Sequence, residues 1–396
     1  MRLRHSTTIA IVLLAFCAQS AGASSRLLSY YSSWAKYQNP PYTSAQIPYD
    51  EMTNIIHAFL LLDANGRGGF HFDDRHFLEP ALISGAHLAG DKVQVSVGGA
   101  GSAQDAAFRK VAASAMARKA FASNLRAFLV KYSYDGVDID WEVPVAPRDT
   151  KNCTALMQQL RAALPAPQWL LSMAIPANPQ NYGTGFDVPS LAAIVDYFNV
   201  MTYDFTGPWM TYAGHNSPLY QSPSDPGQSG SLKTSMDLFA GAYGVAPQQL
   251  NIGTAFYGYQ FNSITALWQS CGGLCGNTVA TYNYGTYIKQ RINQQGWTSY
   301  LDRSAMAPYL LFDNGPGFIT YDDATSTTNK VAYVIGQRNF GGIFMWDLSG
   351  DYDGSSQDLL TAMWTEFQQV AQGSTRWKRP RTFADRGLHI RTLPRT

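Results

Sequence analysis

The chain has 396 residues, and its 29 Lys and Arg residues nearly balance its 28 Asp and Glu residues. This near-neutral charge argues against a polyanionic partner, so we expect no nucleic acid to bind. The length is too great for one small domain, and 13% of the residues are aromatic, which allows a large core.

The N-terminus is predicted to be a secretory signal peptide over residues 1–23. Two arginines within the first four residues precede an apolar run from Ile9 to Phe16, and Ala21-Gly-Ala23 supplies small residues for cleavage. The run is too short to cross a bilayer, so we expect a secreted protein without a membrane span. Lipid attachment at Cys17 is the alternative, and the bulky Phe16 before it disfavours this reading.

From Arg26 onward, short apolar runs alternate with helical patterns, which is typical of a parallel α/β fold. The predicted strands are 26–31, 54–61, 92–97, 134–140, 169–175, 197–202, 250–256 and 341–346. The predicted helices are Ala106–Tyr132, Thr150–Leu164, Ser190–Asp196, Ser231–Tyr243, Thr327–Arg338 and Gln357–Val370. Eight strand–helix units over 24–375 predict a (β/α)8 TIM barrel.

The connection after the seventh strand is too long to be a loop. Residues 259–320 contain a tyrosine-rich run and two further strand candidates, 309–312 and 318–321. We therefore predict a small α+β insertion between strand 7 and helix 7. Within it, Cys271 and Cys275 are placed to form a disulfide in an oxidising compartment, while Cys153 has no evident partner.

The last segment, 376–396, holds seven Lys or Arg residues against one Asp and shows no apolar period. It is predicted to be a disordered basic tail, either without function or with weak affinity for a surface.

The strand at 134–140 leads into four carboxylates within eight residues, Asp135-Gly-Val-Asp138-Ile-Asp140-Trp-Glu142. Side chains alternate along a strand, so Asp138, Asp140 and Glu142 share one face and the intervening apolar residues share the other. Burying unpaired carboxylates is costly, and carboxylates gathered in a cleft commonly mark acid–base chemistry. A solvated edge strand or a cation site are the alternatives.

This Asp-x-x-Asp-x-Asp-x-Glu pattern resembles the signature of glycoside hydrolase family 18, the chitinases and their relatives. Two further patterns of the family occur where the third and sixth strands end, Ser96-x-Gly98-Gly99 and Met201-x-Tyr203-Asp204. The eighth strand ends at Trp346, and an indole there suits the face of a sugar ring. The insertion after strand seven also agrees with the resemblance.

The resemblance implies substrate-assisted hydrolysis, in which the sugar's own acetamide is the nucleophile. Glu142 is then the acid, and neighbouring negative charges are expected to raise its proton affinity. Asp140 orients the acetamido group, Asp138 shares a proton with Asp140, and Tyr203 holds the acetamido oxygen. Asp135 lies on the opposite face and is expected to be structural. No cofactor and no metal are implied.

The same resemblance assigns substrate-binding residues. Trp346 forms the floor of the cleft, with the aromatic residues of strands one and two beneath the catalytic sugar. The full expected set is Trp346, Asp204, Met201, Tyr30, Phe59, Ser96, Gly98, Gly99, Tyr257 and Trp209. Relatives often have cis peptide bonds at positions resembling Ala58–Phe59 and Trp346–Asp347.

Three residues depart from the family pattern. Ala100 and Val143 stand where relatives often have aromatic residues, and Tyr259 stands where they have arginine. These changes concern the leaving-group side of the expected cleft and leave the expected acid in place.

Together these features predict a secreted, monomeric chitinase that acts on chitin or other N-acetylglucosamine-containing glycans. An endo-β-N-acetylglucosaminidase acting on glycoprotein glycans or peptidoglycan is one alternative. A chitinase-like lectin without chemistry is another, and it is disfavoured because all the expected acidic residues are present.

Overall fold

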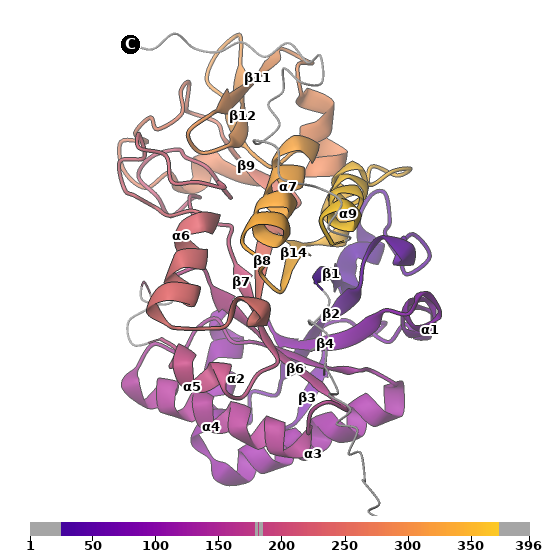
Figure 1. Ribbon diagram of the computed structural model, residues 1–396. Helices are drawn as coiled ribbons and strands as arrows, with labels where there is room; N and C mark the ends of the chain where they lie inside the picture. Colours follow the sequence, from indigo (N-terminus) through magenta and orange to yellow (C-terminus); the bar gives the residue numbers. More distant parts are fainter. Residues whose placement is uncertain (1–24, 179–180, 182–184, 372–396) are drawn as a thin grey trace, which may run out of the picture.

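The computed structural model describes residues 25–178, 181 and 185–371 of the chain (Figure 1). The predicted signal peptide at 1–23 and the predicted basic tail at 376–396 lie outside the described residues. No helix within the described part of the chain has the length and hydropathy needed to cross a membrane.

Eight parallel strands form a closed barrel, which confirms the predicted fold class. Their order is β1, β14, β8, β7, β6, β5, β4 and β2, and β1 pairs with both β14 and β2, which closes the sheet. The strands are β1 (Arg26–Ser32), β2 (Asn54–Leu62), β4 (Lys92–Gly98), β5 (Gly136–Asp140), β6 (Leu170–Pro176), β7 (Tyr197–Met201), β8 (Leu250–Ala255) and β14 (Gly342–Trp346). A short β3 (Phe70–Phe72), which was not predicted, pairs antiparallel with β2.

Helices surround the barrel, and α2 to α5 cover its lower part in the view of Figure 1. They are α1 (Pro80–Ala89), α2 (Ser102–Ala113), α3 (Ala115–Tyr132), α4 (Pro147–Ala163), α5 (Val188–Ala192), α6 (Leu232–Asp237), α7 (Ala324–Val331), α8 (Leu348–Asp351) and α9 (Asp358–Ala371). Helix α6 continues as a π-helical turn over Leu238–Ala242, and α7 continues likewise over Ala332–Gln337.

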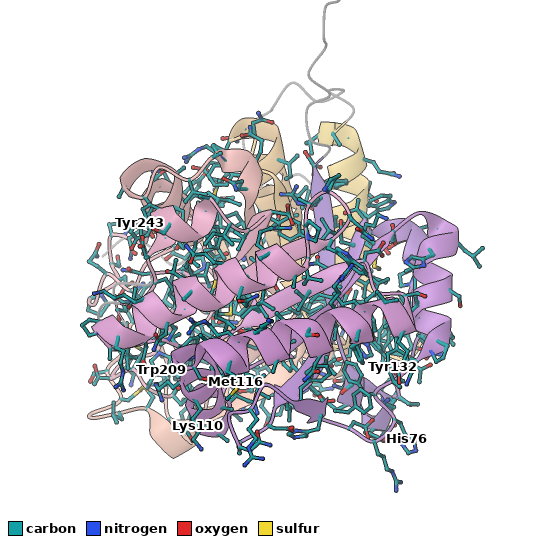
Figure 2. All side chains as sticks on the ribbon, turned by 90° about the horizontal axis from the view of Figure 1, so that it is seen from below. His76, Lys110, Met116, Tyr132, Trp209 and Tyr243 are labelled. Atoms are coloured by element: carbon teal, nitrogen blue, oxygen red, sulfur yellow. A yellow bond between two sulfur atoms is a disulfide. The ribbon has the colours of Figure 1, made fainter. Side chains whose placement is uncertain are left out.

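The prediction of one helix over Ala106–Tyr132 is wrong, because the chain breaks at Ser114. This residue has an extended backbone, and its side chain accepts a hydrogen bond from the Ala117 N–H, so it caps the start of α3. Met116 and Tyr132 lie near the two ends of α3 (Figure 2). The apolar period continues across the break, which explains why the sequence pattern does not reveal it.

The main apolar core lies between the outer face of the barrel and the helices. It includes Val93, Val95 and Val97 of β4 and Leu125 and Leu129 of α3. The residues of the barrel strands that face the helices are apolar, and this made the strands visible in the sequence. The interior of the barrel is different, because it holds a row of buried polar side chains: Gln94, Ser96, Asp138, Ser172, Asn199 and Asn251.

The predicted insertion is present as an antiparallel sheet, which stands above the barrel in Figure 1. Its order is β10, β9, β13, β12 and β11, with β9 (Tyr257–Phe261), β10 (Val279–Asn283), β11 (Trp297–Asp302), β12 (Ala307–Phe312) and β13 (Phe318–Thr320). The two predicted strands correspond to β12 and β13. The sequence analysis missed β9, β10 and β11. Only one residue separates β9 from β8, so in the sequence these two strands form one continuous apolar run.

The cysteines have the expected arrangement. Cys271 and Cys275 form a disulfide at the edge of the insertion, and Cys153 is free and buried.

Candidate active site

The acidic strand β5 lies in the middle of the barrel sheet, paired with β4 on one side and β6 on the other. This position excludes the solvated edge strand that the sequence left open. Trp141 points outward and stacks on Phe108 with ring centroids 5.2 Å apart. The alternation therefore continues beyond the end of the strand, and Asp140 and Glu142 both line the cavity described next.

A cavity of about 1470 Å³ opens at the carboxyl ends of the barrel strands. The following predicted site residues line it: Tyr30, Phe59, Gly98, Gly99, Asp140, Glu142, Met201, Tyr203, Asp204, Trp209, Tyr257 and Trp346. Asp138 and Ser96 are fully buried beneath it. The structure thus brings together side chains from strands that are far apart in the sequence, as expected for the active face of a barrel.

Asp138 is held as a hydrogen-bond acceptor from four strands. Its Oδ2 accepts from the Tyr30 hydroxyl (2.9 Å) and the Ser96 hydroxyl (3.0 Å), and its Oδ1 accepts from the Ser172 hydroxyl (2.7 Å) and the Asn199 amide (3.0 Å). Burial raises the pKa of Asp138, and these donors oppose that rise. Ser172 and Asn199 were not predicted, because nothing in the sequence shows which neighbouring strands point at Asp138.

Ser96 therefore supports Asp138 rather than lining the cavity. The glycines that follow it make room for the backbone. Gly98 has a φ of +120°, and a Cβ at this position would collide with the Asp140 carbonyl oxygen. The next amide, Gly99 N–H, donates to that same carbonyl oxygen (3.0 Å), so β4 and β5 stay locked together at the cavity floor.

Asp140 and Glu142 lie close enough for one carboxyl to donate a hydrogen bond to the other when they share a proton. Burial, followed by the charges of Glu142 and Asp138, raises the pKa of Asp140 well above its usual value. Burial raises the pKa of Glu142 to about 7, with the charge of Asp204 as the next cause. The hydrogen bond with Asp140 lowers the Glu142 pKa.

This corrects the expected cause of the raised Glu142 pKa. The sequence suggested that the neighbouring carboxylates of the motif raise it, but burial acts first, and the carboxylates that add to it are Asp204, which follows β7, and then Asp105 of α2. One oxygen of Asp140, Oδ1, is buried and has no hydrogen-bond partner among the described residues.

Tyr203 and Asp204 follow the end of β7 after one intervening residue, Thr202. Burial, followed by the charge of Asp140, raises the pKa of Tyr203 well above its usual value, so its phenol remains a donor. Asp204 has a φ of +60°, and its N–H donates to Asn216 Oδ1 (2.8 Å). Its carboxylate accepts from the phenols of Tyr257 and Tyr259, the latter at 2.7 Å. Tyr259, the residue that departs from the family pattern, is thus a neutral donor to Asp204.

Aromatic rings form the floor of the cavity around Trp346. Its ring centroid lies 5.4 Å from that of Tyr30 and 5.7 Å from that of Phe59. Trp34, from the short helix Ser33–Tyr37, lies 6.4 Å away and was missed by the sequence analysis. The Trp34 side chain is 38% exposed. It was missed because a single Trp after the first strand does not by itself indicate a substrate-binding residue.

Cis peptide bonds occur at both expected positions, Ala58–Phe59 and Trp346–Asp347. A third cis bond that does not involve proline follows the expected acid, at Glu142–Val143.

Two predicted residues lie away from the floor. Trp209 is 48% exposed, and its ring lies edge-on to that of Tyr259 in β9 of the insertion. Asp135 lies before the start of β5, at the opposite end of the strand, where it accepts from Lys92 Nζ (2.9 Å) and the Val93 N–H (2.8 Å). It joins β5 to β4 and has no contact with the cavity lining. No group of three or more potential metal ligands occurs in the described part of the chain.

Comparisons with known proteins agree with this architecture. A sequence model of the glycosyl hydrolases of family 18 matches residues 26–351. "Chitinase A1" of Niallia circulans is 30% identical over 90% of this chain, which spans 61% of that protein. "Chitinase 1" of Aphanocladium album is 25% identical over 84% of this chain and 83% of its own length.

Among solved structures, the Group IV chitinase of Ostrinia furnacalis in complex with allosamidin superposes with a TM-score of 0.78. It is 26% identical, and the match covers 89% of this chain and all of the other. Because the family match extends over most of the sequence and the barrel and its insertion agree with a solved relative, the chain belongs to the glycosyl hydrolases of family 18.

Proposed function

We propose that the protein is a chitinase that hydrolyses β-1,4 linkages between N-acetylglucosamine units, with retention of the anomeric configuration. The observation that carries the proposal is that Glu142, whose pKa is raised to about 7 by burial, stands at the cavity wall beside a buried oxygen of Asp140 that has no hydrogen-bond partner among the described residues. An acid and a free acceptor side by side suit a substrate that has both a glycosidic oxygen and an acetamido N–H.

Glu142 supplies the proton. Because its pKa is raised to about 7, about half of the Glu142 carboxyl groups still carry a proton at neutral pH, where an ordinary glutamate is ionised. The proton passes to the glycosidic oxygen as the bond from that oxygen to the anomeric carbon breaks. A general acid whose pKa lies near the working pH is the most effective.

The nucleophile is the carbonyl oxygen of the substrate's own acetamido group, as in the exceptional retaining families. Asp138 is unsuited to this role, because it is fully buried and its two oxygens already accept four hydrogen bonds. The acetamido oxygen attacks the anomeric carbon and forms an oxazolinium ion. Water then opens this ion and returns a proton to Glu142.

Two groups hold the acetamide in this scheme. The unpartnered Asp140 Oδ1 accepts the acetamido N–H, which stabilises the positive charge that develops on that nitrogen. The Tyr203 phenol donates to the acetamido oxygen and aims it at the anomeric carbon. The apolar face of the same sugar rests on Trp346.

The proposal is tested with three aryl glycosides on the wild-type protein: the chitobioside, its N-trifluoroacetyl analogue and the cellobioside. We expect rapid hydrolysis of the first, a rate lower by about 100-fold or more for the second because its carbonyl is a poor nucleophile, and none for the third. Equal rates for the first two would overturn the proposed role of the acetamide. The anomeric form of the first product is followed by NMR, and an α product would exclude retention.

The natural substrate class is tested in the same series with chitohexaose and a high-mannose glycopeptide. Preferential cleavage of the hexamer supports a chitinase, whereas preferential cleavage of the glycopeptide identifies an endo-β-N-acetylglucosaminidase. Binding of the hexamer without release of reducing ends identifies a lectin.

A further inference from the structure

A row of polar side chains crosses the barrel from the amino ends of its strands to Asp138. In the sheet, Arg26 of β1, Gly342 of β14, Asn251 of β8 and Asn199 of β7 are consecutive register partners. They therefore lie at one level on four neighbouring strands. Three of them carry hydrogen-bonding side chains, and the fourth carries none.

The missing side chain at Gly342 allows the row to connect. A Cβ at this position would collide with Asn251 Oδ1 and crowd the Arg26 backbone. With glycine there, Arg26 Nε reaches past β14 and donates to Asn251 Oδ1 (3.0 Å). Asn251 Nδ2 then donates to Asn199 Oδ1 (2.9 Å), and Asn199 Nδ2 donates to Asp138 Oδ1 (3.0 Å).

Both ends of this chain have only one possible polarity. A guanidinium can only donate, and Asp138 in its ionised form can only accept. Asn251 must therefore present its oxygen to Arg26 and its amide N–H to Asn199, and Asn199 must do the same toward Asp138. Asn199 Nδ2 also donates to the Tyr30 hydroxyl (3.2 Å), whose own proton goes to Asp138 Oδ2 (2.9 Å). The direction set at Arg26 thus reaches both oxygens of Asp138.

A second series of contacts also connects Arg26 with Asp138. The Arg26 guanidinium lies 4.6 Å from the centre of the Tyr197 ring, and the Tyr197 hydroxyl donates to Gln94 Oε1. Gln94 Nε2 donates to the Ser172 hydroxyl (2.9 Å), which donates to Asp138 Oδ1 (2.7 Å).

We propose that Arg26 is a positioning residue for the reaction: through Asn251 and Asn199 it sets the direction of the hydrogen bonds that hold Asp138 as an acceptor beneath the cleft. Hydrogen bonds in a chain polarise one another, so a cation at one end strengthens donation to the anion at the other. The inference rests on the proposed function, because activity is the readout of its main test.

The groups that face Asp138 allow a specific expectation. Its titratable neighbours are Tyr30 from β1, Asp140 on its own strand, Tyr197 from β7 and Tyr203 from the segment after β7. None of these is cationic, so Arg26 is the positive charge that the chain joins to Asp138. Burial raises the pKa of Asp138, and the hydrogen bonds donated to its carboxylate lower it. Weakening these hydrogen bonds is therefore expected to raise the pKa of Asp138 further.

The main experiment measures the pH dependence of kcat/KM for the aryl chitobioside with Arg26→Met and Asn251→Leu. Arg26 and Asn251 do not line the cavity, so each variant interrupts the row of hydrogen bonds away from the substrate. We expect kcat to fall about tenfold with KM within about twofold, and the apparent pKa of the acidic limb to rise by roughly half a unit to one unit. Arg26→Lys, which keeps a cationic donor, is expected to restore most of the loss.

Asn54→Leu is the matched control. Asn54 is a buried asparagine at the start of β2, at the same end of the barrel, and its Oδ1 accepts from Thr53 rather than from this chain. It is expected to lower stability without moving the pH profile. Profiles of Arg26→Met and Asn251→Leu that superimpose on the wild type, with kcat reduced only in proportion to the folded fraction, would overturn the proposal.

A second readout does not depend on activity and separates this inference from the proposed function. If the wild-type protein cleaves no chitobioside, the proposed function fails, and the free energy of unfolding of Asn251→Leu is compared with that of the wild type at pH 4 and pH 7. A raised carboxyl pKa in the folded state costs stability as the pH rises above the unfolded value. The destabilisation is therefore expected to be larger at pH 7, and an equal destabilisation at both pH values would contradict the role of Arg26.

Discussion

At the scale of single residues, the proton on the expected acid is controlled from outside its own motif. Burial raises the Glu142 pKa first, and the charge of Asp204 raises it further. Burial raises the pKa of Asp204, and the hydrogen bonds donated by the phenols of Tyr257 and Tyr259 oppose that rise and so favour its ionised form. Tyr259, which departs from the family pattern, thus contributes to the acid's environment through Asp204.

Asp204→Asn tests this arrangement. Removing the negative charge stabilises the ionised form of Glu142, so its pKa falls and the proton is lost at lower pH. The basic limb of the kcat/KM profile is expected to move to lower pH by about one unit, whatever the loss in rate. Asp74→Asn is the control, because Asp74 also lines the cavity but pairs with Lys36 and is not among the charges that act on Glu142. A basic limb left in place by Asp204→Asn would contradict this account.

At the scale of elements, the loop after β7 is held by a buried ion pair between Lys330 of α7 and Asp322, which precedes this helix. Lys330 Nζ lies 2.5 Å from Asp322 Oδ2, and both side chains are buried. Lys330 also donates to the Ser217 hydroxyl (2.7 Å), which donates to the Thr202 carbonyl oxygen (2.7 Å). Thr202 directly precedes Tyr203. The contacts from Asp322 through Lys330 and Ser217 to Thr202 therefore connect α7 and the segment after the insertion with the site.

Lys330→Met is expected to destabilise the protein by about 3–5 kcal/mol, because it leaves the Asp322 charge buried without its partner. Lys233→Met is the matched control, since Lys233 and Asp237 form an exposed pair one helical turn apart. Its effect is expected to stay within about 0.5 kcal/mol. Denaturant unfolding of the two variants measures the difference, and similar values for both would show that the buried pair adds nothing to the fold.

At the scale of the whole molecule, stability depends on a histidine that is buried in its neutral form. His57 stacks on Phe77 with ring centroids 4.0 Å apart, and its Nδ1 lies 2.8 Å from the Tyr134 hydroxyl. Burial lowers the His57 pKa to about 3. The unfolded chain takes up a proton below its ordinary pKa of 6.5, while the folded protein does not. The contribution of His57 to stability is therefore fully present above pH 6.5 and is lost progressively as the pH falls toward 3.

The slope of this loss is about 1.4 kcal/mol per pH unit for one such group. His57→Gln keeps an acceptor for Tyr134 and removes the titration, so the free energy of unfolding is expected to fall less steeply between pH 6.5 and 4.5. Urea unfolding at several pH values measures the slope. His71→Gln, at an exposed position beside Asp63, is the control. A slope unchanged by His57→Gln would exclude His57 as a source of the acid sensitivity.

The sequence by itself determined the barrel and the centre of the site. The barrel strands must present apolar side chains to the helices that cover them, and carboxylates that alternate with such residues in one strand stand out in the sequence. The position of Asp140 and Glu142 on one face also follows from the sequence, because side chains alternate between the two faces of a strand. The family patterns around Gly98, Tyr203 and Trp346 are local in sequence and were visible for that reason.

Only the tertiary structure decided which side chains meet across strands. The donors to Asp138 come from β1, β4, β6 and β7, and the contact of Arg26 with Asn251 depends on a missing side chain on the strand between them. Likewise, the pairing of Tyr259 with Asp204 joins segments 55 residues apart. Such contacts depend on strand order and register, which closing the barrel sets and a local sequence pattern does not encode.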